Sequence, residues 1–178
     1  MIRYLLAAAL FAAPALAQGP APTAAETDPM KLGLMASTPP APEAQVRFDE
    51  GSMWIFPKTR WSFSHFQALM PTALVPRGTG PASPLPRGRP LDLARIMMTL
   101  PDGRTLPVAD AFDMSFTDGL VILHRGRIVH ERYAGALAPE GRHIAFSVTK
   151  SFVGTLAELL IHEGKLDPDA PATLLNRI

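Results

Sequence analysis

Apolar residues in the C-terminal third of the chain follow two patterns, the first of which predicts a β-hairpin. The run Leu-Val-Ile-Leu at 120–123 predicts a buried strand, and residues 127–133 predict the strand that returns beside it. Arg125-Gly126 between them is a signal for a tight turn. Upstream, the Pro-Asp-Gly sequence within 100–104 predicts a second turn between two short extended pieces.

The second pattern predicts a helix from Val148 to Glu163. Its apolar residues recur at helical spacing and share one face, at positions 148, 152, 156, 159 and 160. Gly164 suits the residue that follows a helix, and Pro168 prevents an early restart. The hairpin, a loop over 134–143 and this helix therefore form the best-defined part of the chain.

Prolines and aromatic residues divide the remainder. Residues 18–107 hold 15 of the 19 prolines, which interrupt helices and central strands. We expect a disordered Pro/Ala-rich segment over 18–45. We expect residues 46–107 to form an extended N-terminal arm that packs over a folded body, because large apolar groups are numerous there. These groups are Trp54, Ile55, Phe56, Trp61, Phe63, Phe66, Leu69 and Met70.

Residues 1–17 have the pattern of a secretory signal peptide. Arg3 supplies the positive start, an apolar run follows, and Ala15-Leu16-Ala17 is an A-x-A cleavage site. We therefore expect cleavage after Ala17 and a periplasmic or secreted protein with no integral membrane span after signal removal. The alternative is that the segment remains as an uncleaved membrane anchor.

The composition argues against several function classes. A net charge of +1 argues against a dedicated nucleic-acid binder. The absence of cysteine excludes disulfides and thiolate chemistry. The histidines lack the spacing of metal-binding motifs, so we expect neither a metal nor another cofactor. They are His65, His124, His130, His143 and His162.

Ser147 and Lys150 are the strongest candidates for chemistry. They begin and end a Ser-x-x-Lys motif at the start of the predicted helix. A serine hydroxyl is a poor nucleophile until a neighbouring base takes its proton, and a lysine one helical turn away can do so. Because a free lysine has a pKa of about 10.4, the fold must lower it for this role. The backbone N–H of Ser147 is a natural oxyanion donor.

Simpler roles compete with this interpretation. A serine at the start of a helix is most often an N-cap, which would make Ser147 structural. Ser62, Ser64 and His65 also lie close together, but a local Ser-x-His pair without an orienting carboxylate is no catalytic triad. We therefore interpret that group as part of the aromatic arm.

Several motifs resemble the β-lactamase-related serine hydrolases. The hairpin, Phe-Ser-Val-Thr-Lys-Ser at 146–151 and Glu-Gly-Lys-Leu-Asp-Pro at 163–168 resemble the superfamily as a whole. Arg-Trp-Ser-Phe-Ser-His at 60–65 and Pro-Thr-Ala at 71–73 resemble its 6-aminohexanoate-dimer (nylon-oligomer) hydrolase branch. The resemblance implies an α/β (α+β) fold with an antiparallel sheet flanked by helices. It also implies that Ser147 is the acylated nucleophile and Lys150 its proton partner.

The resemblance further implies groups that the motifs here do not supply. The family uses a tyrosine from a Tyr-x-Asn-like motif on a downstream helical domain and a second oxyanion donor on a late strand. Tyr133 precedes Ser147 and lacks the asparagine, so we interpret it as a structural strand residue. We therefore expect residues 108–178 to be the N-terminal part of an incomplete domain, with an exposed hairpin edge and a poorly packed Ser147 helix. Such a chain would be a fragment that is inactive alone.

Two function classes follow from the sequence. The first is a serine hydrolase that cleaves amide or carboxylic ester bonds of a small molecule through an acyl-enzyme on Ser147. The second is a non-enzymatic exported protein built on a degenerate hydrolase scaffold. Amide and ester substrates suit the same serine and lysine equally, and the branch resemblance makes a β-lactam the less favoured substrate.

Overall fold

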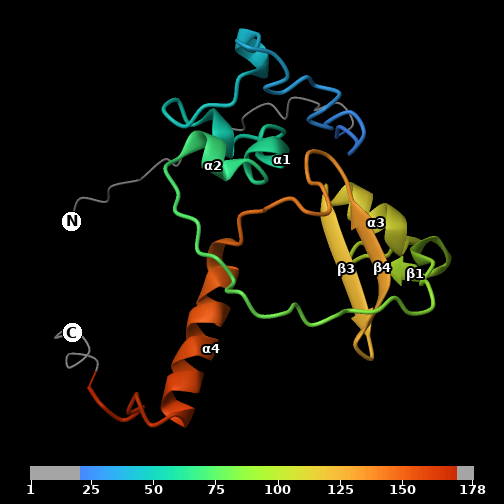
Figure 1. The fold of residues 1–178 in the computed structure, drawn as a ribbon. Helices are drawn as coiled ribbons and strands as arrows, with labels where there is room; N and C mark the ends of the chain where they lie inside the picture. The colour runs from blue at the N-terminus through green and yellow to red at the C-terminus, as the bar shows by residue number, and fades with distance from the viewer. Residues whose placement is uncertain (1–20, 172–178) are drawn as a thin grey trace, which may run out of the picture.

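The computed structural model describes residues 21–171, which form a small α+β structure with two separate antiparallel hairpins (Figure 1). The expected signal peptide lies outside the described residues. The helices are α1 (Thr59–Ser62), α2 (Phe66–Leu69), α3 (Val108–Met114) and α4 (Thr149–His162), and the strands are β1 (Met97–Thr99), β2 (Thr105–Pro107), β3 (Gly119–His124) and β4 (Arg127–Tyr133). Short 3-10 turns complete the chain: η1 (Pro42–Ala44), η2 (Ser52–Trp54), η3 (Leu93–Arg95) and η4 (Phe146–Val148).

The β3–β4 hairpin confirms the strongest strand prediction. The strands pair antiparallel from Gly119 opposite Tyr133 to His124 opposite Arg127, with a register shift after Ile122. Arg125 and Gly126 both have positive φ, 51° and 72°, as the favoured two-residue hairpin turns require. The β1–β2 pair likewise confirms the extended pieces expected on either side of residues 100–104.

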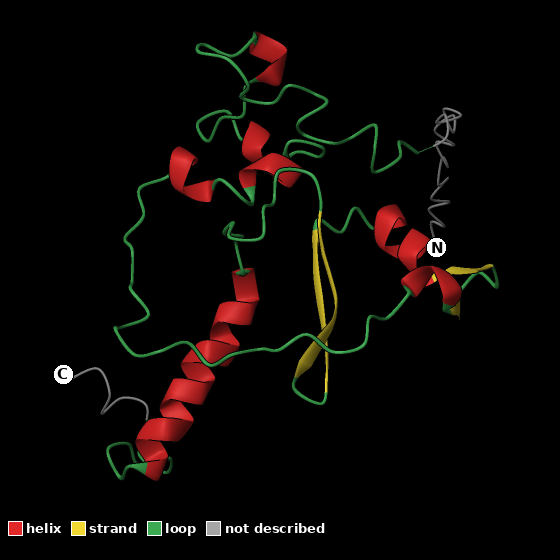
Figure 2. Cartoon of the chain, turned by 45° about the vertical axis from the view of Figure 1, so that its right-hand side comes forward, coloured by secondary structure: helices red, strands yellow, loops and turns green. Residues whose placement is uncertain are grey.

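The burial predicted for the first strand is wrong. Val121 is 42% exposed and Leu123 is 49% exposed. Helix α4 lies apart from the hairpin in both views and so does not cover these side chains (Figures 1 and 2). The apolar run therefore identified the strand correctly but not its environment.

One edge of the hairpin is covered by the proline-rich segment. Gly88 donates its N–H to the Ile128 carbonyl at 2.9 Å, and Leu91 donates to Val129 at 2.7 Å. In return, the Ile128 N–H donates to the carbonyl of Pro86 at 3.0 Å. Prolines suit an edge because they need no partner for a missing N–H. The expected exposed edge is therefore partly protected at β4.

The main apolar core joins the N-terminal arm to the segment that precedes it. It consists of Leu34, Val46, Met53 and Trp61, of which Met53 is fully buried. Ala136, from the loop after β4, packs against it. We expected the arm to cover a core formed elsewhere, whereas the structure forms the core from the arm and the segment before it.

The disorder expected over 18–45 is corrected for the described residues from 21 onward. Leu34 is 7% exposed, and the Met35 N–H donates to the Ala44 carbonyl at 3.1 Å. Residues 23–36 form successive turns, and η1 follows them. Proline restricts the unfolded chain, so few buried apolar groups suffice to offset the ordering of such a segment. The composition alone overstated the cost of that ordering.

Helix α4 confirms the predicted helix within one or two residues of its ends. It has no buried residue, and four of its large apolar side chains are exposed, from 53% at Leu159 to 71% at Phe152. Figure 2 shows it standing apart from β3 and β4. The sequence therefore specifies an amphipathic helix whose apolar face has no cover among residues 21–171.

A buried ion pair joins the arm to the hairpin. Arg60 in α1 is 7% exposed and donates to both carboxylate oxygens of Asp118, which directly precedes β3. Its remaining nitrogen donates to the Ala24 carbonyl at 2.6 Å and the Thr27 hydroxyl at 2.9 Å. Gly135 has φ +58°, and a Cβ there would lie 2.8 Å from Asp118 Oδ1. Three distant chain segments therefore meet at one guanidinium.

Replacing Asp118 by asparagine is expected to destabilise the chain by about 3 kcal/mol, because Arg60 keeps a buried charge without its counter-ion. Urea unfolding measures the loss. The matched control is Asp49→Asn, which breaks the exposed pair of Arg47 and Asp49. The loss of this pair should lower the free energy of unfolding by less than about 1 kcal/mol. Equal losses in the two variants would show that the buried pair is not a principal contact.

Candidate functional site

Ser147 lies in η4, immediately before α4, and its hydroxyl faces Lys150. Lys150 Nζ donates to Ser147 Oγ at 3.2 Å, and both side chains are exposed. The N-cap of α4 is Val148 and that of η4 is Ala145, and neither helix has a side-chain capping bond. Ser147 is therefore not a helix N-cap, and its contact with Lys150 is the one that the motif predicts.

The residue before Ser147 has an unusual backbone. Phe146 has φ +45°, a left-handed conformation that is a genuine outlier for a bulky residue. Residues held in this region cost about 1–3 kcal/mol each and persist only where their surroundings fix them. This bend begins the turn that presents Ser147, so the contacts that hold Phe146 also hold the serine.

Those contacts come from the arm. The rings of Phe146 and Phe63 meet edge to face at 5.1 Å between centroids, and the Trp54 ring lies 6.3 Å from Phe146. The Ile144 N–H donates to the Phe63 carbonyl at 2.8 Å. We call Trp54, Phe63 and Phe146 the aromatic clamp. No local sequence pattern predicts this link, and the number of aromatic residues in the arm is the one signal for it.

The residues that follow Arg60 in the segment 60–65 have structural roles in the arm. Trp61 is a core residue whose indole stacks on His65 at 4.3 Å and 7° between planes. Ser62 is fully buried and donates to the Met53 carbonyl at 2.6 Å. His65 Nδ1 lies 3.0 Å from the Trp61 carbonyl, so the ring contacts neither serine hydroxyl. The structure therefore places Ser62 and His65 in the arm, as the sequence indicated.

Tyr133 is engaged away from Ser147. Its hydroxyl donates to Glu131 Oε1 at 2.7 Å, and Glu131 forms an ion pair with Arg87. The hydrogen bond to Glu131 raises the pKa of the Tyr133 phenol and lowers the pKa of the Glu131 carboxyl. A tyrosine that acts as a base needs the opposite shift. This geometry agrees with a structural role for Tyr133.

Among residues 21–171, no three His, Asp or Glu side chains gather as a metal site would require. None of the helices described there is long and apolar enough to cross a membrane.

Comparison with known proteins agrees with the motifs. Residues 113–175 match the β-lactamase family. The chain is 34% identical over 119 residues to the 6-aminohexanoate-dimer hydrolase of Paenarthrobacter ureafaciens, a match that covers 66% of this chain and 28% of that protein. The chain therefore spans less than a third of the curated relative that it matches. No solved structure gives a significant match. The resemblance to the β-lactamase-related hydrolases is confirmed.

Replacing Glu131 by glutamine is expected to lower the pKa of Tyr133 toward the ordinary tyrosine value of about 10, because the carboxylate that favours the neutral phenol is gone. The titration of tyrosinate absorbance measures this shift. A Tyr4→Phe background leaves Tyr133 as the only phenol. A pKa that stays constant or rises would contradict the assignment of Glu131 as the cause.

Proposed function

We propose that this chain, whose residues 113–175 match the β-lactamase family, carries the nucleophile of a serine hydrolase. Ser147 is the proposed acyl acceptor and Lys150 its proton partner. The observation that carries the proposal is the 3.2 Å contact between Lys150 Nζ and Ser147 Oγ at the start of α4. It supports the pairing because a nucleophile and its base must lie within about hydrogen-bond reach of each other.

The proposed reaction has two stages. Ser147 Oγ attacks the carbonyl carbon of an amide or carboxylic ester while its proton passes to the neutral amine of Lys150. The tetrahedral intermediate then collapses, the C–N or C–O bond breaks, and the leaving amine or alcohol takes up the proton. Water subsequently cleaves the acyl-enzyme, which releases a carboxylic acid and restores the serine. The backbone N–H of Ser147 is the proposed first oxyanion donor.

The substrate class follows from the relative. The name of the Paenarthrobacter protein describes hydrolysis of a 6-aminohexanoate dimer, a linear amide. We therefore infer a small-molecule amide or carboxylic ester as substrate, with a linear amide favoured over a β-lactam. The match covers only 28% of that relative. The hydrolase activity is therefore proposed for this chain by similarity to part of the relative.

A non-enzymatic scaffold is the second candidate. It is favoured by the exposure of Ser147 and Lys150 and by the engagement of Tyr133 with Glu131. Among residues 21–171, we identify no second oxyanion donor and no further acid or base beside the serine. Hydrolysis of the acyl-enzyme relies on such groups. We therefore expect the chain to become acylated at Ser147 without measurable turnover. Sustained hydrolysis of a p-nitrophenyl ester or the 6-aminohexanoate dimer, lost in Ser147→Ala, would contradict that expectation.

A fluorophosphonate probe is expected to label Ser147 specifically, and Ser147→Ala should abolish labelling. Lys150→Met should slow labelling by at least about a hundredfold, the lower range for loss of a general base. Lys150→Arg should be equally slow, because arginine keeps the positive charge but cannot accept a proton. Peptide mass spectrometry identifies the labelled residue.

The matched control is Ser151→Ala, which removes a neighbouring exposed hydroxyl and should leave the labelling rate unchanged. Normal labelling of Lys150→Arg would reduce Lys150 to an electrostatic role. A folded chain whose Ser147 is never labelled would instead support the non-enzymatic scaffold.

A further inference from the structure

A cavity of about 380 Å³ lies between the arm and the segment that leads to Ser147. That volume is within the usual range for small-molecule sites. Phe63 and Ile144 contribute to its wall, and Phe63 also contacts Phe146 in the aromatic clamp. The pocket therefore lies next to the residue that precedes Ser147, yet neither Ser147 nor Lys150 lines it.

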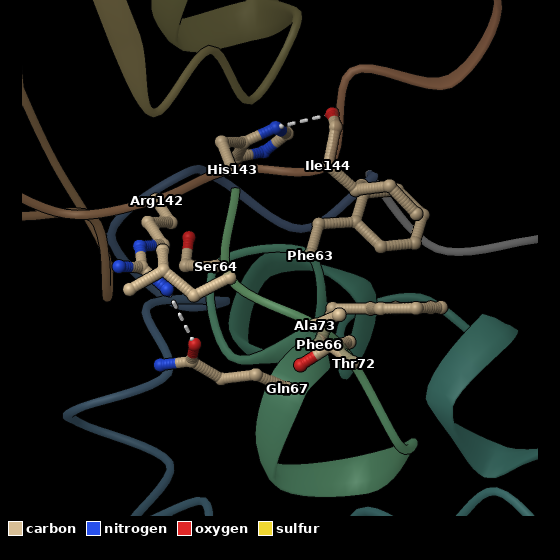
Figure 3. A pocket seen from close by; sticks show the side chains of 10 residues that line it. Phe63, Ser64, Phe66, Gln67, Thr72, Ala73, Arg142, His143 and Ile144 are labelled. Carbon is tan, nitrogen blue, oxygen red and sulfur yellow. Dashed lines mark hydrogen bonds between the residues drawn. The ribbon is translucent and has the colours of Figure 1, made fainter. Parts of the chain in front are cut away.

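The walls of this pocket are chemically two-sided. Figure 3 shows Arg142, Ser64 and Gln67 along one side, with the Phe63 ring and Ile144 across from them. An apolar body with a polar end would match such a surface, since binding pockets combine apolar walls with a few placed polar groups.

The polar side carries an unneutralised positive charge. Arg142 donates to Gln67 Oε1 at 2.8 Å, and that neutral amide is its side-chain partner. Among residues 21–171 no carboxylate forms an ion pair with Arg142, and none of the described lining residues is acidic. A planar guanidinium has five donors in a fork that matches a carboxylate, so most of its donors remain available to a ligand.

Ser64 adds a second unused polar group. Its hydroxyl oxygen is shielded from water and has no hydrogen-bond partner among the described residues. A buried hydroxyl left without a hydrogen-bond partner is energetically unfavourable. Rotation of the side chain about its Cα–Cβ bond would let the hydroxyl donate to a ligand oxygen held by Arg142. This orphaned hydroxyl, beside an unneutralised guanidinium, distinguishes the pocket from an ordinary surface hollow.

We propose that this pocket is a binding site for a small organic carboxylate with an apolar body. The carboxylate binds Arg142 and Ser64, and the apolar body packs against Phe63, Phe66 and Ile144. The site is separate from the proposed acylation chemistry, because it requires neither a reactive Ser147 nor a neutral Lys150. A ligand there would contact the Phe63 ring, which also packs against Phe146 in the aromatic clamp.

The probe is 3-phenylpropionate, titrated into the full chain carrying Ser147→Ala and followed through the Ile144 methyl signal by NMR. Saturable binding is expected, weakened roughly tenfold or more by Arg142→Gln and less by Ser64→Ala, since one charge-assisted hydrogen bond is worth about a factor of ten. The neutral 3-phenylpropionamide should bind at least as weakly as the acid binds the Arg142→Gln chain. Added salt should reduce the affinity of the acid.

Arg125→Gln is the matched control, because it removes an arginine at the β3–β4 turn that does not line this pocket, and it should leave the affinity unchanged. Equal binding of acid and amide, or equal loss in Arg125→Gln and Arg142→Gln, would overturn the proposal. Absence of saturable binding in a folded chain would also overturn it. Because the titrated chain carries Ser147→Ala and so cannot be acylated at this position, none of these outcomes depends on acylation.

Discussion

The ion pair between Arg60 and Asp118 is the contact on which the relation between the two halves of the chain depends. The main apolar core lies in the arm and the segment before it, whereas the hairpin leaves its apolar side chains half exposed. Apolar packing therefore orients the hairpin only weakly. A guanidinium that is 7% exposed fixes a direction, because all three of its nitrogens donate to acceptors on Asp118, Ala24 or Thr27. Burial makes the loss of either charge costly.

The same helical turn extends this order toward Ser147, the proposed nucleophile. Phe63 follows Arg60 by three residues, and it reaches Phe146 with its ring and Ile144 with its carbonyl. Phe146 holds a left-handed backbone just before Ser147. The arm thus contributes to the position of a serine more than 80 residues away in sequence. A catalytic serine needs such external support, because a small displacement of a nucleophile can lower its rate by orders of magnitude.

Local sequence signals predicted the elements well and their surroundings poorly. Arg125-Gly126 identified the hairpin turn, and apolar spacing identified α4. Both signals come from residues that are close together in the sequence. The pairing of Arg60 with Asp118 and the clamp on Phe146 join residues far apart, and no local pattern encodes them. Gly135 gives a clear example, because it is needed for the close approach to Asp118, which no pattern of neighbouring residues reveals. Ser147 and Lys150 were predicted because one helical turn separates them.

The contacts of Phe63 with Phe146 and Ile144 lead us to infer that the arm positions Ser147, the proposed nucleophile, for attack. The rate constant for phosphylation of Ser147 by a fluorophosphonate, compared between the native chain and Phe63→Leu, tests it most directly. Phe56→Leu is the reference, because the Phe56 ring packs at a tilt against Phe116, 4.6 Å between centroids, instead of against the clamp. The account predicts a fall of roughly tenfold or more in folded Phe63→Leu, as expected for a displaced nucleophile, and little change in Phe56→Leu. Equal rates in the native and Phe63→Leu chains would contradict it.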